Sequence, residues 1–370
     1  MSNKMISVFG SDIGQKEIDN VTRCLQSQWL SIGNSVKLFE NNFKEKYNLN
    51  SFAMVDSGSN ALFMAVTLLN LPKNSEIIIP SFTWLACAQA VLMAGHTPIF
   101  CDVDLTTMNI TREHIESKLT KRTGAIMVVH YAGLPVEMKE IMELGLPIIE
   151  DAAHAVHSKY NGISCGNIAD IGIYSFDSVK NLAVGEGGGI CAKNPELIDR
   201  AKTMRYCGIG ETSFAQSSKK DRWWEYNITE PFIKMIPTDI SASIGLAQLE
   251  RIEELQKRRK NIWDYYQTNL GGVLNPVDAT GTNTHSYFTY SIRVKNRDKL
   301  AKYLLSEDIY TTLRFHPLHL NPIYNQTNIS LLNCEALNMD TLSIPLHPRL
   351  TDIEVEKVVD KINNFTKNNL

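Results

Sequence analysis

The sequence of 370 residues lacks the features that define several protein classes. No apolar stretch approaches the ~20 residues that span a bilayer, and the opening residues carry no apolar signal core. The seven cysteines are an odd number and include no C-x-x-C pair, so a disulfide framework is not indicated. Most of them lie in apolar surroundings, as small buried side chains of a reducing compartment do. These absences predict a cytoplasmic protein that does not cross a membrane.

The sequence also lacks an excess of charge of either sign. Its formal net charge is -3 and its pI is near 6.3, so it has no broad basic field of the kind that nucleic-acid and anionic-membrane binders use. The densest basic run, residues 257–260, lies in a helical pattern, and we interpret it as a solvated face. Low-complexity tracts and internal repeats are missing too. With 44% apolar and 21% charged residues, the composition is that of an ordinary globular protein.

Short apolar runs bounded by turn residues recur through the first two thirds of the chain. They cover residues 53–59, 75–82, 97–104, 124–133, 146–153, 170–176 and 187–194. Helical patterns at residues 60–70 and 83–95 lie between them, and this alternation predicts an α/β fold with a mostly parallel sheet covered by helices. A longer helical pattern at residues 240–270 leads toward a second lobe. Since the chain is longer than one core usually supports, we expect a large domain over residues 1–250 and a smaller one over 251–370.

Candidate functional residues follow the apolar runs, because ligands of open α/β sheets bind beyond the carboxyl ends of the strands. They are Ser57, Gly58, Ser59, Asn60, Trp84, Asp102, His130, Asp151, His154, Ser175 and Lys180. Gly58 and Ser59 stand directly before a helix, which Ser59 would cap, and the free N–H groups of that helix start suit a phosphate. A plain helix cap with a turn glycine explains the same residues.

Two adjacent acids, Glu150 and Asp151, end one of the predicted strands. Alternation along a strand places their side chains on opposite faces of the sheet. Asp151 can give a buried heterocycle a charge-assisted hydrogen bond of ~1.5 to 3 kcal/mol, or it can cap the following turn. We predict that Glu150 faces away from any ligand.

Lys180 lies in a polar loop that runs into four glycines, Gly185 and Gly187 to Gly189. A lysine whose amine pKa is lowered by desolvation can form a Schiff base, although an ordinary loop lysine is the default interpretation. The glycine run lacks G-x-G-x-x-G spacing and precedes a strand, which excludes a dinucleotide fingerprint.

Two interpretations compete for the residues after the strands. His154 and His157, with His130, suggest a metal site, but no helical pattern or third placed ligand supports it, and we predict none. A phosphate-binding helix start, an aromatic ring at Trp84, the acid Asp151 and the amine Lys180 together match what pyridoxal 5′-phosphate requires.

The motifs resemble those of a known family, the sugar aminotransferases of the DegT/DnrJ/EryC1/StrS group, within the fold type I pyridoxal-phosphate enzymes. The similar segments are W-L-S-I-G at 29–33, D-S-G-S-N-A-L at 56–62, residues 80–104, E-D-A-A-H-A at 150–155, residues 174–189, residues 226–254 and residues 343–351. The resemblance covers nearly the whole chain. It implies a large domain with a mostly parallel seven-stranded sheet and a smaller C-terminal α+β lobe.

The resemblance also implies roles for individual residues. Lys180 would carry pyridoxal 5′-phosphate covalently, Asp151 would pair with the ring nitrogen, and His154 would lie near the phenolic oxygen. Trp84 would stack on the ring and Ala153 would contact it. The phosphate would be held by Gly58, Ser59, Asn60 and Ser175 together with Asn227 of the neighbouring subunit. A homodimer with shared active sites is therefore expected.

The activity that the resemblance implies is amino transfer from an amino acid, glutamate in most of the family, to a nucleotide-linked keto-deoxysugar. The loop after Lys180 reads G-E-G-G where the 3-keto subgroup commonly has G-D-A-G, so we expect an NDP-4-keto-6-deoxyhexose, with the 3-keto sugar as the alternative. The product would enter a surface glycan such as the O-antigen of lipopolysaccharide. Arg314, His316 and His319 are candidates for binding the donor carboxylate or the substrate diphosphate, and packing of the lobe explains each equally simply.

Two features of the sequence bear on this interpretation. Asp177 departs from the family, which often has histidine or tyrosine there, so the contacts of this loop with a sugar are not carried over. Lys180 argues against a related dehydratase, in which histidine replaces the lysine. Lys180 and Asp151 together argue against a non-catalytic relative.

Overall fold

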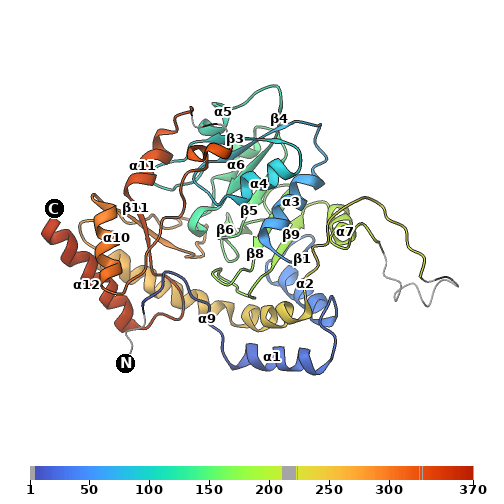
Figure 1. Cartoon of the computed structure of the whole chain (residues 1–370), viewed down its shortest axis with the longest axis horizontal. Helices are drawn as coiled ribbons and strands as arrows, with labels where there is room; N and C mark the ends of the chain where they lie inside the picture. Colours follow the sequence, from blue (N-terminus) through green and yellow to red (C-terminus); the bar gives the residue numbers. More distant parts are fainter. Residues whose placement is uncertain (1–4, 211–221, 223, 325, 327, 370) are drawn as a thin grey trace.

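The computed structural model describes residues 5–210, 222, 224–324, 326 and 328–369. A seven-stranded sheet with helices on both faces forms the large part of the molecule, and a smaller lobe stands beside it (Figure 1). The strand order is β1-β9-β8-β5-β4-β2-β3. The strands are β1 (Ala53–Val55), β2 (Glu76–Pro80), β3 (Thr97–Cys101), β4 (Thr123–Val129), β5 (Ile148–Asp151), β8 (Ile171–Ser175) and β9 (Gly188–Ala192).

Parallel pairing dominates the sheet and sets the position of the candidate residues. Only β9 runs antiparallel to its neighbours, β1 and β8. The α/β class and the seven strands predicted from sequence are confirmed. In the register of the sheet, Asp151 of β5 lies beside Val129 of β4 and Ile173 of β8. The carboxyl ends of these strands therefore meet at one edge of the sheet.

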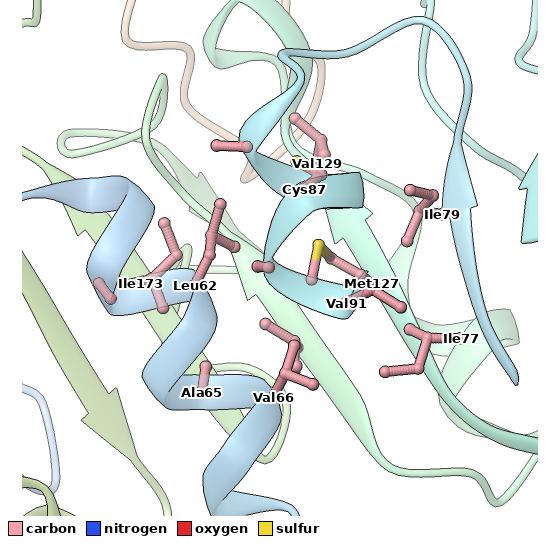
Figure 2. Packing of buried hydrophobic residues seen from close by; sticks show 14 of the residues in the cluster. Leu62, Ala65, Val66, Ile77, Ile79, Cys87, Val91, Met127, Val129 and Ile173 are labelled. Carbon is pink, nitrogen blue, oxygen red and sulfur yellow. The ribbon is translucent and has the colours of Figure 1, made fainter. Parts of the chain in front are cut away.

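One face of the sheet is covered by α3 (Gly58–Leu68), α4 (Ala86–Met93) and α7 (Pro195–Met204). Because side chains alternate along a strand, Ile77 and Ile79 of β2 face this layer while Ile78 faces the opposite one. Figure 2 shows the packing of this layer through Leu62, Ala65, Val66, Ile77, Ile79, Cys87, Val91, Met127, Val129 and Ile173.

The other face is covered by α2 (Asn34–Lys46), α5 (Arg112–Glu116), α6 (Met138–Met142) and the first half of α9 (Asp239–Asn269). Helix α1 (Gln15–Gln26) lies along α9 on the outside (Figure 1). The buried Asp239 at the start of α9 accepts hydrogen bonds from the backbone N–H groups of Gly33, Ser35 and Val36, at 2.9, 3.2 and 2.9 Å. A carboxylate at the start of α2 thus satisfies N–H groups that have no partner within that helix.

The smaller lobe is built around the second half of α9. Its other elements are β10 (Tyr290–Arg293), α10 (Arg297–Ser306), β11 (Thr341–Ile344) and α12 (Asp352–Asn369). Helix α11 (Leu332–Asp340) precedes β11 in the chain, but its buried Cys334 and Leu337 pack in the core of the large domain. The short strands β6 (Lys159–Tyr160) and β7 (Ile163–Ser164) pair with each other on the large domain. Trp263 and Tyr266 of α9 join the core of the smaller lobe, and so does Ile6 from the other end of the chain. The expected domain boundary at residue 250 falls within α9, and that division stays a prediction.

The basic run at 257–260 does not form a single solvated face. Arg259 is fully buried and donates hydrogen bonds to the carbonyl oxygens of Tyr287, Phe288 and Leu346, at 3.5, 3.3 and 3.2 Å. The interpretation as a solvated face is wrong for Arg259, because its side of α9 packs against the smaller lobe.

The burial of the cysteines can be compared with what their sequence surroundings predicted. Six of the seven cysteines are buried and all seven are free, as their apolar surroundings in the sequence predicted. Among the described ranges, no helix is both long and apolar enough to cross a lipid bilayer.

Candidate active site

A cavity of about 360 Å³ opens at the carboxyl edge of the sheet. It brings together eleven of the residues singled out in the sequence: Ser57, Gly58, Ser59, Trp84, Asp151, Ala153, His154, Ser175, Asp177, Lys180 and Arg314. The other candidates do not line it: Asn60, Asp102, His130, Asn227, His316 and His319. Trp84 is half exposed, so its indole forms part of the cavity mouth.

The start of α3 forms one end of this cavity. The hydroxyl of Ser57 accepts a hydrogen bond from the Asn60 backbone N–H, at 3.1 Å. Ser57 therefore caps the helix, and the prediction that Ser59 does so is wrong by two residues. The Asn60 side chain donates to Asp56 Oδ1 at 2.8 Å, which directs its amide away from the cavity. The N–H groups of Gly58 and Ser59 have no partner within the helix and remain available to an anion.

Close packing explains two glycines at the same end. A Cβ on Gly58 would lie 2.7 Å from Ser175 Cβ, and one on Gly188 would lie 2.4 Å from the Ser57 carbonyl carbon. Because Gly188 lies in β9, directly behind the start of α3, the glycine run after Lys180 lets this strand support the anion-binding turn.

Asp151 ends β5 with its carboxylate in the cavity wall. The carboxylate accepts a hydrogen bond from the Ala153 backbone N–H at 2.9 Å and one from Cys87 Sγ at 3.2 Å. Burial raises the pKa of Asp151, since the charged form loses its water. A protonated ring nitrogen at this position would restore a partner for that charge.

The neighbouring Glu150 lies on the opposite face, as predicted. It is fully buried and accepts hydrogen bonds from the backbone N–H groups of Gly166, Ile168 and Ala169, at 2.9, 2.7 and 2.6 Å. It also lies 2.9 Å from His130 Nε2. These contacts fix the segment between β7 and β8, and they give Glu150 a structural role.

Lys180 enters the cavity from the loop after β8. The residue is half-buried, and its amine lies 4.7 Å from the centre of the Phe288 ring. Enclosure of the amine and repulsion by Arg314 lower the pKa of Lys180 to about 8. A substantial fraction of this amine is therefore neutral near physiological pH, which is the form that attacks a carbonyl carbon.

His154 forms the apolar floor beside Lys180. Its ring stacks on Phe288 at 4.1 Å and 15°, and on Phe315 at 5.8 Å and 20°. Burial, with repulsion by Lys180 and Arg314, lowers the pKa of His154 well below its usual value, so the ring is neutral at pH 7. Its Nδ1 is buried without a hydrogen-bond partner in the described part of the chain, and a ligand atom would supply one.

The three histidines that suggested a metal lie in different surroundings. His130 contacts Glu150, His154 stacks on aromatic rings, and His157 Nε2 lies 3.5 Å from Glu253 Oε2. Within the described residues, no group of three His, Cys, Asp or Glu side chains is arranged to hold a metal ion.

Of the three candidates in the smaller lobe, only Arg314 reaches the cavity. His316 is exposed, with Nδ1 3.1 Å from Asn338 Oδ1. His319 is fully buried, with Nδ1 2.7 Å from Ser81 Oγ. This contact packs His319 against the large domain, and its backbone N–H also donates to Ser81 Oγ at 3.1 Å.

Asn227 lies between α7 and α9 in the chain. The residue is exposed and is not among the residues that line this chain's own cavity. Its assignment to a neighbouring subunit stays a prediction.

Sequence reasoning missed several side chains that shape the cavity. Phe9, Thr83, Glu186 and Phe315 line it, and Phe288 lies beneath Lys180. Burial together with the negative charge of Asp177 raises the pKa of Glu186. Indirect signals in the sequence existed for two of them, since Glu186 belongs to the G-E-G-G motif and Thr83 to the similar segment at residues 80–104.

Comparison with known proteins agrees with this geometry. The pattern of the DegT/DnrJ/EryC1/StrS aminotransferase family matches residues 11–363. The chain is 33% identical over 378 residues to the dTDP-4-dehydro-2,3,6-trideoxy-D-glucose 4-aminotransferase of Saccharopolyspora spinosa, covering 99% of this chain and 98% of that protein.

Solved structures extend the comparison to three dimensions. The aminotransferase TlmJ from Streptoalloteichus hindustanus has a TM-score of 0.92 and 35% identity, covering 98% of this chain and 99% of that one. Spr1654 from Streptococcus pneumoniae, described as a sugar aminotransferase and solved in a PLP-form, has a TM-score of 0.89 and 26% identity, covering 98% of both chains. Because the family pattern spans nearly its whole length, the protein belongs to the DegT/DnrJ/EryC1/StrS aminotransferase family and has the fold of its sugar aminotransferases.

Proposed function

We propose that the protein is a pyridoxal-phosphate-dependent aminotransferase that moves an amino group from L-glutamate to an NDP-4-keto-6-deoxyhexose. The observation that carries this proposal is the meeting of Lys180, Asp151 and the start of α3 in one cavity. Each of them alone has an ordinary structural explanation. Their convergence matches the aldehyde, the ring nitrogen and the phosphate of a single cofactor.

The residues present fit that cofactor. The N–H groups of Gly58 and Ser59 and the hydroxyl of Ser175 suit the phosphate, and the glycine contacts behind them leave the backbone accessible. Asp151 suits the ring nitrogen, and the unpartnered Nδ1 of His154 suits an oxygen of the ring. When bound, the cofactor supplies an electron sink for the substrate's reacting carbon.

The chain's own residues then have distinct tasks. Lys180 would hold the cofactor covalently, and its free amine would carry the proton to and from the donor's α-carbon. Its lowered pKa would let the amine accept and release that proton near neutral pH. Asp151 would keep the ring nitrogen protonated. Phe288 and Phe315 exclude water from the floor of the cavity.

The acceptor is the finer part of the proposal. The G-E-G-G loop and the relative from Saccharopolyspora spinosa, named as a 4-aminotransferase, both favour amination at C4. Amination at C3 is the second candidate. We further propose that the enzyme works in the cytoplasm, as a homodimer in which Asn227 completes the neighbouring phosphate site, and that its product enters a surface glycan.

The test uses purified protein supplied with the cofactor. We expect a visible absorbance band that borohydride fixes to Lys180, and amino transfer from glutamate to 4-keto nucleotide sugars with the product identified by NMR. Lys180→Ala should abolish both, whereas Lys193→Ala, at an exposed loop lysine, should change neither. A protein that gains no band with added cofactor, or a Lys180→Ala variant with normal transfer, would contradict the proposal.

A further inference from the structure

The guanidinium of Arg314 is an unusual cation within the cavity. Arg314 is 7% exposed, and burial lowers its pKa to about 10. Among the described residues its guanidinium makes no ion pair with a carboxylate. Its central carbon instead lies 4.4 Å from the ring centres of both Phe9 and Phe288. Asp177, which lines the same cavity, attracts this charge without forming an ion pair with it, so the guanidinium is open to an anion that enters the cavity.

Phe9 is held firmly although it lies near the start of the chain. The backbone of Ile6 exchanges hydrogen bonds with Asp308 and Tyr310, at 2.8 and 2.9 Å. The Ser11 hydroxyl donates to the Ser178 carbonyl, two residues from Lys180, at 2.5 Å. These contacts, on both sides of Phe9, fix its ring against Arg314.

We propose that Phe9 is a positioning residue that holds the Arg314 guanidinium ready to bind the carboxylate of the amino donor. The proposal rests on the aminotransferase function proposed above. Aromatic rings cover the flat faces of a guanidinium and leave its N–H edge free, and that edge matches a planar carboxylate through two parallel hydrogen bonds.

Geometry favours the donor carboxylate over the sugar diphosphate. The Lys180 amine and the Arg314 guanidinium both lie within 5 Å of the Phe288 ring centre, at 4.7 and 4.4 Å. The two cations also repel each other, which contributes to the lowered pKa of Lys180, so an anion at Arg314 lies on the same side of the cavity as the reacting amine. In an amino acid the carboxylate is attached to the same carbon as the reacting amine, whereas the diphosphate of a 4-keto sugar is attached across the hexose ring from the reacting carbon.

The experiment separates the two half-reactions. The donor half-reaction is measured as the absorbance change after glutamate is added to the cofactor-bound enzyme. The acceptor half-reaction is measured as the opposite absorbance change after the keto sugar is added to the enzyme with the amine form of the cofactor. We expect Phe9→Leu to weaken glutamate binding about tenfold, as the loss of a desolvated cation–π contact predicts, and to leave the acceptor half-reaction within about twofold. Phe9→Tyr should restore glutamate binding.

A second measurement does not depend on catalysis. Calorimetry of the cofactor-free protein with glutarate, a dicarboxylate without an amine, should show the same weakening in Phe9→Leu. The control is Phe365→Leu, which removes an aromatic contact with Tyr303 in the core of the smaller lobe, and it should bind glutarate as the wild type does. Melting temperatures verify that the variants are folded.

The possible results are distinct. Unchanged glutamate and glutarate binding in Phe9→Leu, with active wild type, overturns the role of Phe9 alone. If Phe9→Leu slows only the acceptor half-reaction, Arg314 binds the sugar diphosphate. That result also overturns the proposal. A wild type that performs neither half-reaction refutes the proposed function itself.

Discussion

Replacing Glu150 by glutamine tests the contrast between the two adjacent acids at the end of β5. One carboxylate oxygen of Glu150 accepts from Ile168 and Ala169, and the other accepts from Gly166 and faces His130. Glutamine keeps one acceptor oxygen, which can serve one of these two pairs of partners. Its NH₂ group faces the other pair and cannot accept their hydrogen bonds, so two hydrogen bonds to a charged group are lost. At ~1.5 to 3 kcal/mol each, the expected loss is about 3 to 6 kcal/mol.

The assay is urea unfolding of the cofactor-free protein at neutral pH, with the slope m checked for constancy. A loss of this size is a large part of the ~5 to 15 kcal/mol that holds a typical domain together. Asp151→Asn is the matched control. Because burial raises the pKa of Asp151, the folded protein disfavours its charged form, and removing that charge should leave stability unchanged or higher. A loss below about 1 kcal/mol in Glu150→Gln would refute the structural role of Glu150.

Three further predictions concern the amine, the anion-binding turn and the start of α2. The rate at which the cofactor attaches to Lys180 should rise with pH through about 8, because only the neutral amine reacts, and Arg314→Leu should move this midpoint upward by removing a repelling cation. Gly188→Ala should weaken cofactor binding in an equilibrium titration, because the added Cβ would lie 2.4 Å from the Ser57 carbonyl carbon. Asp239→Asn should cost about 2 kcal/mol in urea unfolding, since a charged cap of several N–H groups becomes a neutral one.

Each of these has its own control. An attachment midpoint that does not move in Arg314→Leu would contradict the electrostatic explanation. Gly210→Ala adds a Cβ with no atom within 4 Å and should bind the cofactor normally. Asp264 lies on the exposed side of α9 in an ion pair with Lys260, so Asp264→Asn should lower the free energy of unfolding by less than about 1 kcal/mol. An equally small loss in Asp239→Asn would show that the cap formed by Asp239 is dispensable.

The features that were predicted correctly are those that a local sequence pattern determines. The strands follow from apolar runs between turn residues, and the facing of Glu150 and Asp151 follows from alternation along one strand. The cap of α3 shows the limit, because Ser57 and Ser59 are both suitable caps and only the backbone course decides between them. Arg259 was misjudged because charge alone does not show which side of a long helix meets a second lobe.

The parts of the site that depend on distant contacts were not predictable. Phe9 and Phe288 carry no chemistry that a motif search would notice, and they meet Arg314 only because both ends of the chain join the smaller lobe. Cys87 was correctly expected to be buried, yet its contact with Asp151 depends on the packing of α4 against β5.

The short strand β5 carries a further consequence for the way this chain can change over evolution. Structural and chemical acids occupy consecutive positions, so inserting or deleting one residue within Ile148–Asp151 would exchange the faces on which they lie. The carboxylate of Asp151 would then point toward the helices on the opposite face of the sheet, and the carboxylate of Glu150 would face the cofactor. Length variation in descendants should therefore be confined to the flanking loops, while within this strand only substitutions survive.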